Sequence, residues 1–326
     1  MNFTSLLKIT SVFTLLSAMS LYSWAQTEQT PQAPVVIMQP KLSTTLSSYY
    51  YDLKGKKGDD RGYYDFKNLN ARIDLLSVGY GTAGSWTVNL LVQHYELYTE
   101  TLFPQAVAPW DYSEDRTVGM GDTYLTVLAP TYFLHSWMII PDFGISIPTG
   151  SINYKSHLPG LQTANLAYNG QHGSGTYDAI LGLTVLLAQP EKSLLFGNRL
   201  GATIRTGKNS NDYTLGNLYK LDTWLDYNTS FGLTPRFVGY YRLKGPISGY
   251  DKSRGIGGAE NIADEFYHHD QKDWMVSVAF KYSYFINPAL SFAVEAGLPL
   301  LQGTENWDNS RVVTNYYGGL TLAGQF

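Results

Sequence analysis

The chain has 326 residues, contains no cysteine, and carries a formal net charge of −4 with only 15% charged residues. The lack of cysteine excludes a disulfide framework, a thiolate metal site and a cysteine nucleophile. The weak negative net charge gives no excess of basic residues of the kind that binds nucleic acid. Tyrosine is used heavily, at 26 residues, beside 7 tryptophans and 31 glycines. Amphipathic aromatic rings favour a membrane–water boundary, and glycine with aromatic residues is common in β-barrels.

The N-terminal 25 residues have the pattern of a secretory signal peptide. Lys8 precedes an apolar stretch from about Ile9 to Leu21, and the small residues Ser23 and Ala25 flank Trp24 in the A-x-A manner. The alternative is a membrane anchor, but the stretch is shorter than the roughly 18 to 20 apolar residues that a spanning helix needs. We therefore expect cleavage after Ala25, so that residues 1–25 are a signal peptide and the mature chain is exported.

Residues 26–41 follow as a segment rich in Pro, Gln and Thr, "QTEQTPQAPVVIMQP" up to Pro40. This composition predicts a flexible periplasmic lead. The segment is too short for a folded plug. Contact with a periplasmic partner remains an open alternative to a simple tail.

The rest of the chain, 42–326, has the pattern of strands. No run of 18 apolar residues follows the signal peptide, which excludes a helical membrane protein and leaves a closed β-barrel as the spanning structure. Alternation is clear in "WMVSVAFKYSYFI" (274–286) and "LSFAVEAGL" (290–298), and it recurs in 86–93, 195–207 and 224–233. In each segment charged residues fall on one face only, as the two environments of a barrel wall require.

About twelve strands are predicted in this way, with connections that alternate short and long. Their expected ranges are 42–51, 67–82, 85–98, 120–134, 137–149, 175–188, 194–207, 221–233, 235–244, 273–286, 289–300 and 312–326. Short periplasmic turns and long extracellular loops are typical of outer-membrane barrels, so both termini are expected in the periplasm. A soluble β-sandwich also alternates, but it does not need strands this long, an aromatic-rich apolar face, or loops sorted by length.

The chain ends on such a strand. In "YYGGLTLAGQF" (316–326) the even positions are apolar or glycine, and Thr321, Ala323 and Gln325 occupy the other face. Phe326 therefore lies on the lipid-facing side. A terminal aromatic residue of this kind is expected to be the signal that the outer-membrane assembly machinery recognises.

The same alternation predicts which charged residues line the lumen. The expected inward set is Arg72, Asp74, Asp142, Asp178, Arg199, Arg205, Asp226, Arg236, Arg242, Lys281 and Glu295. Both signs are present in comparable number, so a strongly ion-selective pore is not indicated. One interpretation is that these groups pair across neighbouring strands and fill a narrow interior. The other is that some of them leave a polar path beside Tyr and Trp rings, along which a small planar solute moves.

Three motifs resemble a known family. "GMGDTYLTVLAPTYFL" (119–134), "GISIPTG" (144–150) and "GSGTYDAILGL" (173–183) are similar to signatures of the MetA-pathway phenol degradation-like family of outer-membrane transporters. The resemblance covers most of the chain after about residue 45. It implies a barrel that passes small, often aromatic or hydrophobic, solutes, and it does not carry over a particular substrate.

The motifs also have structural interpretations. Gly119 and Gly121 lie where a loop enters a strand and permit a bulge, and Pro148 marks a strand leaving the barrel rim. The functional interpretation concerns the third long loop, 150–174, which is expected to fold toward the lumen as a constriction. Its candidate residues are Tyr154, Lys155, His157, Tyr168 and His172.

Enzymatic and metal signatures are weak. "QHGSG" (171–175) is similar to the His-x-Ser pairing of outer-membrane phospholipases, but position 186 is Leu, so no Asn follows at that family's downstream spacing. The run "ADEFYHHDQKD" (263–273) contains carboxylates and imidazoles that suit divalent ions, yet it reads better as a solvated loop. "RGIGGAE" (254–260) lacks the strand-then-helix context of a dinucleotide site.

The sequence thus predicts an all-β transmembrane antiparallel barrel in the outer membrane of a Gram-negative bacterium. We expect passive uptake of small solutes, among them aromatic or hydrophobic compounds, with no enzymatic activity, no cofactor, no metal and no nucleic-acid partner. The expected partners are outer-membrane lipid, the assembly machinery and small-molecule solutes. Two alternatives stay open: a non-conducting surface barrel whose extracellular loops bind a partner, and an outer-membrane phospholipase-like enzyme.

Overall fold

The computed structural model describes residues 41–56, 65–82, 86–102, 112–133, 136–155, 165–166, 168–189, 193–251, 270–287, 289–305 and 311–326. The expected signal peptide and nearly all of the N-terminal lead lie outside these residues. No helix in the described part is long and apolar enough to cross a membrane. The helical content there is a single 3-10 turn, η1 (Tyr168–Gly170).

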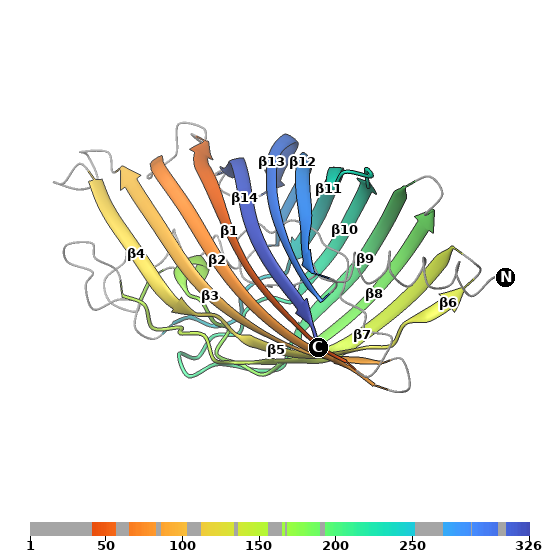
Figure 1. The fold of residues 1–326 in the computed structure, drawn as a ribbon. Helices are drawn as coiled ribbons and strands as arrows, with labels where there is room; N and C mark the ends of the chain where they lie inside the picture. Colours follow the sequence, from red (N-terminus) through yellow and green to blue (C-terminus); the bar gives the residue numbers. More distant parts are fainter. Residues whose placement is uncertain are drawn as a thin grey trace.

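The described residues form β-strands joined edge to edge (Figure 1). They are β1 (Leu42–Lys56), β2 (Asp65–Gly81), β3 (Thr87–Leu102), β4 (Tyr112–Met120), β5 (Thr123–Leu128), β6 (Thr131–Phe133), β7 (Trp137–Ile147), β8 (Asp178–Gln189), β9 (Leu194–Arg205), β10 (Leu218–Tyr227), β11 (Leu233–Lys244), β12 (Gln271–Asn287), β13 (Leu290–Glu305) and β14 (Arg311–Gln325). Because β4, β5 and β6 follow one another along one interrupted strand, the wall is a 12-strand antiparallel barrel.

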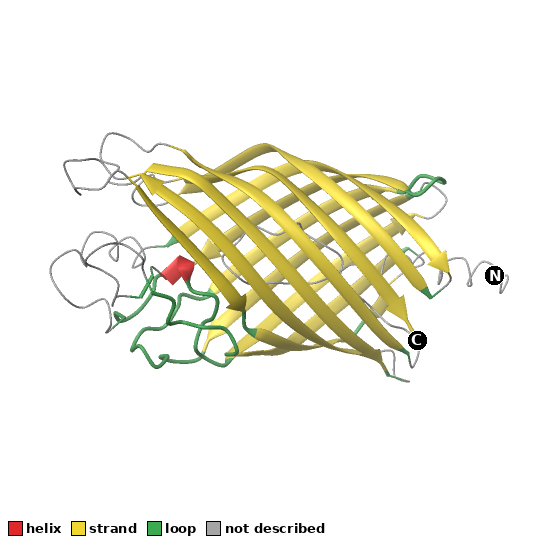
Figure 2. Cartoon of the chain, turned by 60° about the vertical axis from the view of Figure 1, so that its left-hand side comes forward, coloured by secondary structure: helices red, strands yellow, loops and turns green. Residues whose placement is uncertain are grey.

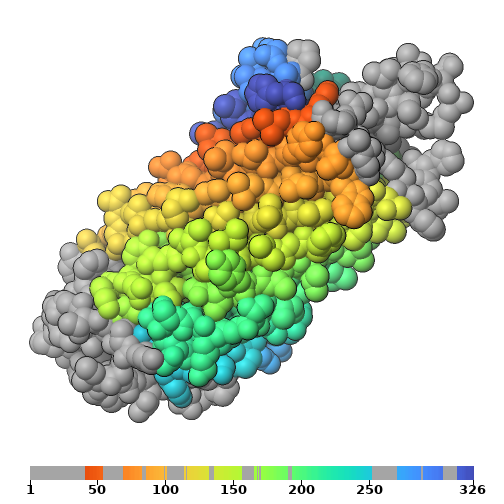
Figure 3. All heavy atoms as spheres, turned by 90° about the horizontal axis from the view of Figure 1, so that it is seen from below, coloured from red at the N-terminus to blue at the C-terminus, as the bar shows by residue number. Residues whose placement is uncertain are grey.

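The barrel closes through its first and last strands. β1 pairs with β14 on one side and with β2 on the other, and β2 pairs with β3 to complete the ring. At the end of the chain the backbone groups of Leu42 and Phe326 exchange hydrogen bonds of 3.0 and 2.8 Å. Figure 2 shows the strands inclined to the barrel axis, with the C-terminus at one end and η1 at the other. In Figure 3 the colours follow chain order across the outer surface, because consecutive strands are neighbours.

The outer surface is apolar, as the alternation predicts. Leu320 is 51% exposed and Phe326 is 74% exposed on β14 and its end, whereas Ala323 between them is buried. Val276, Phe280 and Tyr284 on β12 are exposed in the same way. Rings such as Tyr219 and Tyr241 toward the loop end, and Tyr80 and Tyr227 toward the turn end, flank this apolar surface. Two aromatic girdles around an apolar band are the mark of a barrel that spans a membrane.

Two sequence expectations need correction. The expected strands 85–98 and 120–134 leave 99–119 as a long loop, but β3 continues to Leu102 and β4 begins at Tyr112. The predicted strand 120–134 is instead interrupted at Gly121–Asp122 and again before β6. Gly121 and Asp122 are both buried, so the inward face shifts by one residue at this point. A period of two, extended from the residues before or after this point, cannot reveal such a shift.

Candidate functional site: the lumen and the loop that enters it

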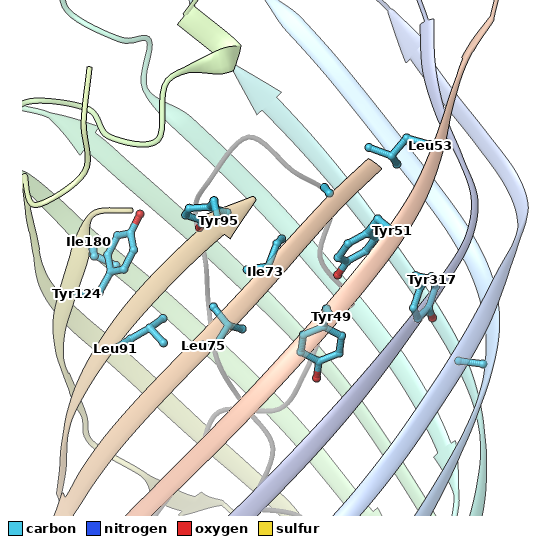
Figure 4. Packing of buried hydrophobic residues seen from close by; sticks show 12 residues of the cluster. Tyr49, Tyr51, Leu53, Ile73, Leu75, Leu91, Tyr95, Tyr124, Ile180 and Tyr317 are labelled. Carbon is cyan, nitrogen blue, oxygen red and sulfur yellow. The ribbon is translucent and has the colours of Figure 1, made fainter. Parts of the chain in front are cut away.

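The inner wall of the barrel has two chemically different halves. The first half is aromatic and aliphatic and comes mainly from β14, β1, β2, β3 and β5 (Figure 4). Its buried residues are Tyr49, Tyr51, Leu53, Ala71, Ile73, Leu75, Leu91, Tyr95, Tyr124, Ile180, Ala279 and Tyr317. We call this set the aromatic wall.

Several rings of the aromatic wall lie close to a glycine of a neighbouring segment. A Cβ atom at Gly121 would overlap the ring of Tyr95, and one at Gly319 would overlap the ring of Tyr49. Gly297 gives the same space to Tyr317. Each glycine therefore lets a large ring lie along the wall instead of projecting across the lumen.

The second half, on β7 to β13, carries a series of ion pairs, most of which join different strands, beside a second apolar cluster that includes Met138, Ile140 and Trp224. We call it the charged wall. Arg199 lies 2.7 Å from Asp142, with both side chains almost completely buried. Arg236 bridges Asp226 at 2.8 Å and Glu295 at 3.0 Å. The remaining pairs are Arg205–Asp178, Lys220–Asp222 at 3.0 Å and Arg242–Asp273 at 3.7 Å.

The predicted lumen set can now be placed. Asp142, Asp178, Arg199, Arg205, Asp226, Arg236, Arg242, Lys281 and Glu295 lie on the inward face. Arg72 and Asp74 do not, and their assignment to the lumen was wrong. They pair with each other on the outer face, where 54% and 26% of their side chains are exposed.

The reason for this error lies in β2. Its inward residues Ala71, Ile73 and Leu75 belong to the aromatic wall, so the rule that charge points inward fails on this strand. Arg72 and Asp74 lie near the middle of this strand, opposite Glu96 and His94 of β3, so charged and polar side chains gather on the outer face there while the apolar side chains point inward.

Lys220, Asp222 and Asp273 also belong to the charged wall, and sequence reasoning missed them. β10 begins at Leu218, earlier than the expected strand start at residue 221. Extending the alternation from Asp226 back through 224 would have placed Asp222 and Lys220 on the inward face. Likewise, the predicted strand 273–286 already contained Asp273 at its first position.

The three motifs behind the family resemblance meet at one point of the wall. The carboxylate of Asp122 accepts hydrogen bonds from the backbone N–H groups of Gly150, at 3.1 Å, and of Ser174, at 2.8 Å. The hydroxyl of Thr149 donates to the carbonyl of Gly121 at 2.8 Å. Gly150 and Gly173 approach so closely that a Cβ at Gly150 would lie 2.6 Å from the Gly173 Cα. Asp122 therefore anchors both ends of loop 150–174 to the interrupted strand, and we call this cluster the motif junction.

Loop 150–174 lies against the aromatic wall through His172 and Tyr154. The Nε2 of His172 is 2.8 Å from the Thr117 hydroxyl, and its ring centroid lies 4.4 Å from that of Tyr154 and 5.5 Å from that of Tyr95. The hydroxyl of Tyr154 donates to the carbonyl of Val118 at 3.0 Å. Burial lowers the pKa of His172 to about 4, so the imidazole is neutral at pH 7.

The other candidates of the loop lie apart from this contact. Lys155 donates to Asn165 at 2.7 Å. Tyr168 packs with Tyr213, Leu215 and Ile247 in a separate buried cluster, which we call the cap cluster. His157 is outside the described residues. Of the five predicted constriction residues, the structure thus brings Tyr154 and His172 together at the inner wall.

The two chemical alternatives have no support in this geometry. The hydroxyl of Ser174 donates to the carbonyl of Thr176 at 3.0 Å, while His172 Nε2 is engaged with Thr117, so the described contacts contain no Ser–His hydrogen bond of the kind that activates a nucleophile. Within the described ranges no group of three or more His, Asp or Glu side chains is placed to hold a metal. The run 263–269, with its paired histidines, lies outside them.

Comparison with known proteins supports the architecture. No family model matches the sequence, and no curated protein matches it. An outer membrane channel from Pseudomonas putida F1 has a similar structure, with a TM-score of 0.56 over 88% of this chain and 96% of that chain at 13% identity. The NanC porin aligns over 86% and 98% at 13% identity with a TM-score of 0.43. The KdgM porin in complex with disordered oligogalacturonate aligns over 86% and 99% at 12% identity with a TM-score of 0.39. The first similarity shows the fold, a closed antiparallel barrel of the kind seen in outer membrane channels.

Proposed function

We propose that this protein is an outer-membrane channel for passive uptake of small solutes, including aromatic and hydrophobic compounds. The observation that carries this proposal is the division of the inner wall. Apolar rings on one side offer contact to a planar solute, and ion pairs on the other side offer hydrogen bonds to its polar substituents.

The arrangement of the rings supports passage along the lumen. Tyr49, Tyr95 and Tyr317 lie against glycines of the neighbouring strands, so the wall itself accommodates part of each ring. The charges on the opposite wall are paired and nearly balanced, which favours a path for polar groups without strong selection for one sign of ion.

Three further assignments belong to the same proposal. Residues 1–25 act as the export signal, which directs the mature chain to the outer membrane of a Gram-negative bacterium. Phe326 serves as the recognition residue for the assembly machinery. The meeting of the three motifs at Asp122 supports membership of the MetA-pathway phenol degradation-like family, because motifs far apart in sequence then share one structural role.

The test is uptake of labelled phenol, benzoate and a neutral sugar into lipid vesicles that contain the refolded protein. Entry faster than in empty vesicles, and greater for the two aromatic compounds than for the sugar, is the expected result. Equal entry with and without protein for all three compounds would contradict the transport proposal and favour a barrel whose loops bind a partner.

A matched pair of variants tests whether solutes use the lumen. Ala71 is a small inward residue of the aromatic wall, and Leu76 on the same strand points outward. Ala71→Trp is expected to slow aromatic uptake because the new ring projects into the lumen, whereas Leu76→Trp leaves uptake unchanged. Both variants must show the heat-modifiable migration of a folded barrel before rates are compared.

A further inference from the structure

One part of the barrel wall is not held by a backbone ladder. β4 pairs with β3 along its whole length, but on its other edge no described strand pairs with it. Directly below, β5 pairs with both β3 and β7. β7 ends at Ile147 and β8 begins at Asp178, so the wall beside β4 is completed by the loop between them. We call the line between β4 and this loop the seam.

The contacts across the seam are few and made by side chains. Among the described residues, the Tyr154 hydroxyl bonds the Val118 carbonyl, the His172 imidazole bonds the Thr117 hydroxyl, and the Asp122 carboxylate bonds two backbone N–H groups. At the motif junction the Thr149 hydroxyl also bonds the Gly121 carbonyl. Each hydrogen bond contributes about 0.5–1.5 kcal/mol net, and those to a charged group about 1.5–3 kcal/mol. Above the motif junction, therefore, β4 and the loop separate at far lower cost than two paired strands.

Apolar surface lies on both sides of the seam. Tyr95, Tyr124 and Ile180 of the aromatic wall flank it on the inside. On the outside, Val118 and Met120 of β4 and Tyr177 before β8 are exposed, the last to 63%. Small residues lie along this line: Gly119 leaves space for the Tyr154 hydroxyl, and Gly150 and Gly173 of the loop contact each other.

We propose that apolar solutes cross the barrel wall at the seam, between the aromatic wall of the lumen and the outer leaflet of the membrane. This inference rests on the proposed uptake function and adds a route to it. A solute that prefers lipid leaves the lumen sideways once the Tyr154 and His172 contacts release, while polar solutes follow the charged wall. Asp122 keeps the loop attached at the lower end of the seam.

The first experiment cross-links the seam. The chain has no native cysteine, so Thr117→Cys with His172→Cys introduces the only two thiols, which a short cleavable bifunctional thiol reagent then joins. The matched control is Thr214→Cys with Ser248→Cys, a backbone-paired couple in the loops away from the seam. Each double variant is compared with itself before linking, after linking and after cleavage, so the loss of the native side chains cancels.

Two readouts separate the wall route from the lumen. Entry of 1-N-phenylnaphthylamine, which fluoresces only in apolar surroundings, into the membranes of expressing cells reports solute delivered to lipid. Potassium chloride conductance of the purified barrel in planar bilayers reports the lumen. Linking the seam is expected to reduce dye entry to the level of cells without the protein, reversibly, with conductance unchanged. The control link changes neither.

A second variant tests the opposite direction. A Cβ atom at Gly119 would overlap the Tyr154 hydroxyl, so Gly119→Ala displaces the ring that closes the seam and is expected to increase dye entry several-fold. Gly303→Ala is the matched control, because its Cβ would lie 2.6 Å from the Trp274 Nε1 on the outer face, away from the seam.

The outcomes divide cleanly. If linking the seam leaves dye entry unchanged while the unlinked protein delivers dye, the wall route is wrong and the channel proposal stands. If linking reduces conductance and dye entry together, the loop controls the lumen and the wall route is again wrong. If the parent protein delivers no dye and carries no aromatic solute into vesicles, it is the proposed function that fails.

Discussion

The buried pair of Arg199 and Asp142 gives the sharpest energetic prediction. Asp142 on β7 passes over Gly182 of β8, where a Cβ would lie 2.7 Å from the Asp142 Cγ, and meets Arg199 on β9. The two side chains are 3% and 2% exposed, so neither charge has water as a substitute partner. Arg199→Ala leaves a carboxylate buried and uncompensated.

The expected loss in the free energy of unfolding is about 3–5 kcal/mol, the usual cost of breaking one half of a buried pair. Replacing both residues by Leu removes the orphaned charge, so Arg199→Leu with Asp142→Leu is expected to be close to neutral or stabilising. The control is Arg72→Ala, which breaks an exposed pair on the outer face and is expected to cost about 0–1 kcal/mol.

The assay is reversible urea unfolding of the refolded barrel in lipid vesicles, followed by tryptophan fluorescence, with the loss of heat-modifiable migration as a second probe. An Arg199→Ala variant that is no less stable than Arg72→Ala would refute the reasoning. So would a double Leu variant as unstable as the single Ala variant, because the pair would then contribute through packing and not through charge.

Three further predictions follow. His172 is neutral at pH 7 in the folded state because burial lowers its pKa to about 4, whereas the unfolded side chain takes up a proton near pH 6.5. The free energy of unfolding therefore falls by on the order of 3 kcal/mol as the pH drops from about 6.5 to 4, and this loss is complete below pH 4. In His172→Asn, the free energy of unfolding measured between pH 7 and pH 3 should no longer show this pH-dependent loss. The same pH dependence in the variant as in the parent would mean that His172 does not cause it. Leu320→Arg, on the lipid face of β14, is expected to cost about 2–4 kcal/mol, whereas a cost near zero would place that position outside the apolar band. Phe326→Ala keeps the backbone bonds to Leu42 and is expected to lower the amount of assembled barrel in cells while in-vitro refolding proceeds as in the parent; equal losses in both would mean that the ring stabilises the fold and is not a recognition signal.

Much of the barrel is predictable because its wall divides two environments. Along β12 to β14 the outside is lipid and the inside is polar or small, so a period of two places Phe280, Leu298 and Leu322 outward without ambiguity. The same logic placed nine charged residues between Asp142 and Glu295 on the inward face, although it missed Lys220, Asp222 and Asp273. It failed on β2, where the inner face is apolar and Arg72 pairs with Asp74 on the outer face.

The motif junction was beyond the reach of periodicity for a different reason. Asp122 lies in an interruption where two successive residues are buried, and its partners Gly150 and Ser174 come from the two ends of a loop. No regular spacing connects these positions. The sequence marked their glycines as candidates for bulges and turns. The close approach of Gly150 and Gly173, and the bonds from one carboxylate to both segments, depend on how the loop returns to the wall, which the sequence does not show.

The pairing of β1 with β14 also sets the order of events in assembly. The hydroxyls of Ser47 and Thr321 are 2.9 Å apart although 274 residues separate them, and bringing such distant segments together carries an entropic cost that grows with the logarithm of the separation. The hairpins between them need no such search and can form as soon as their residues are present. The first strand therefore keeps an unsatisfied edge until β14 is available to pair with it. A chain that lacked β14 would leave this edge of β1 open to pairing with other chains.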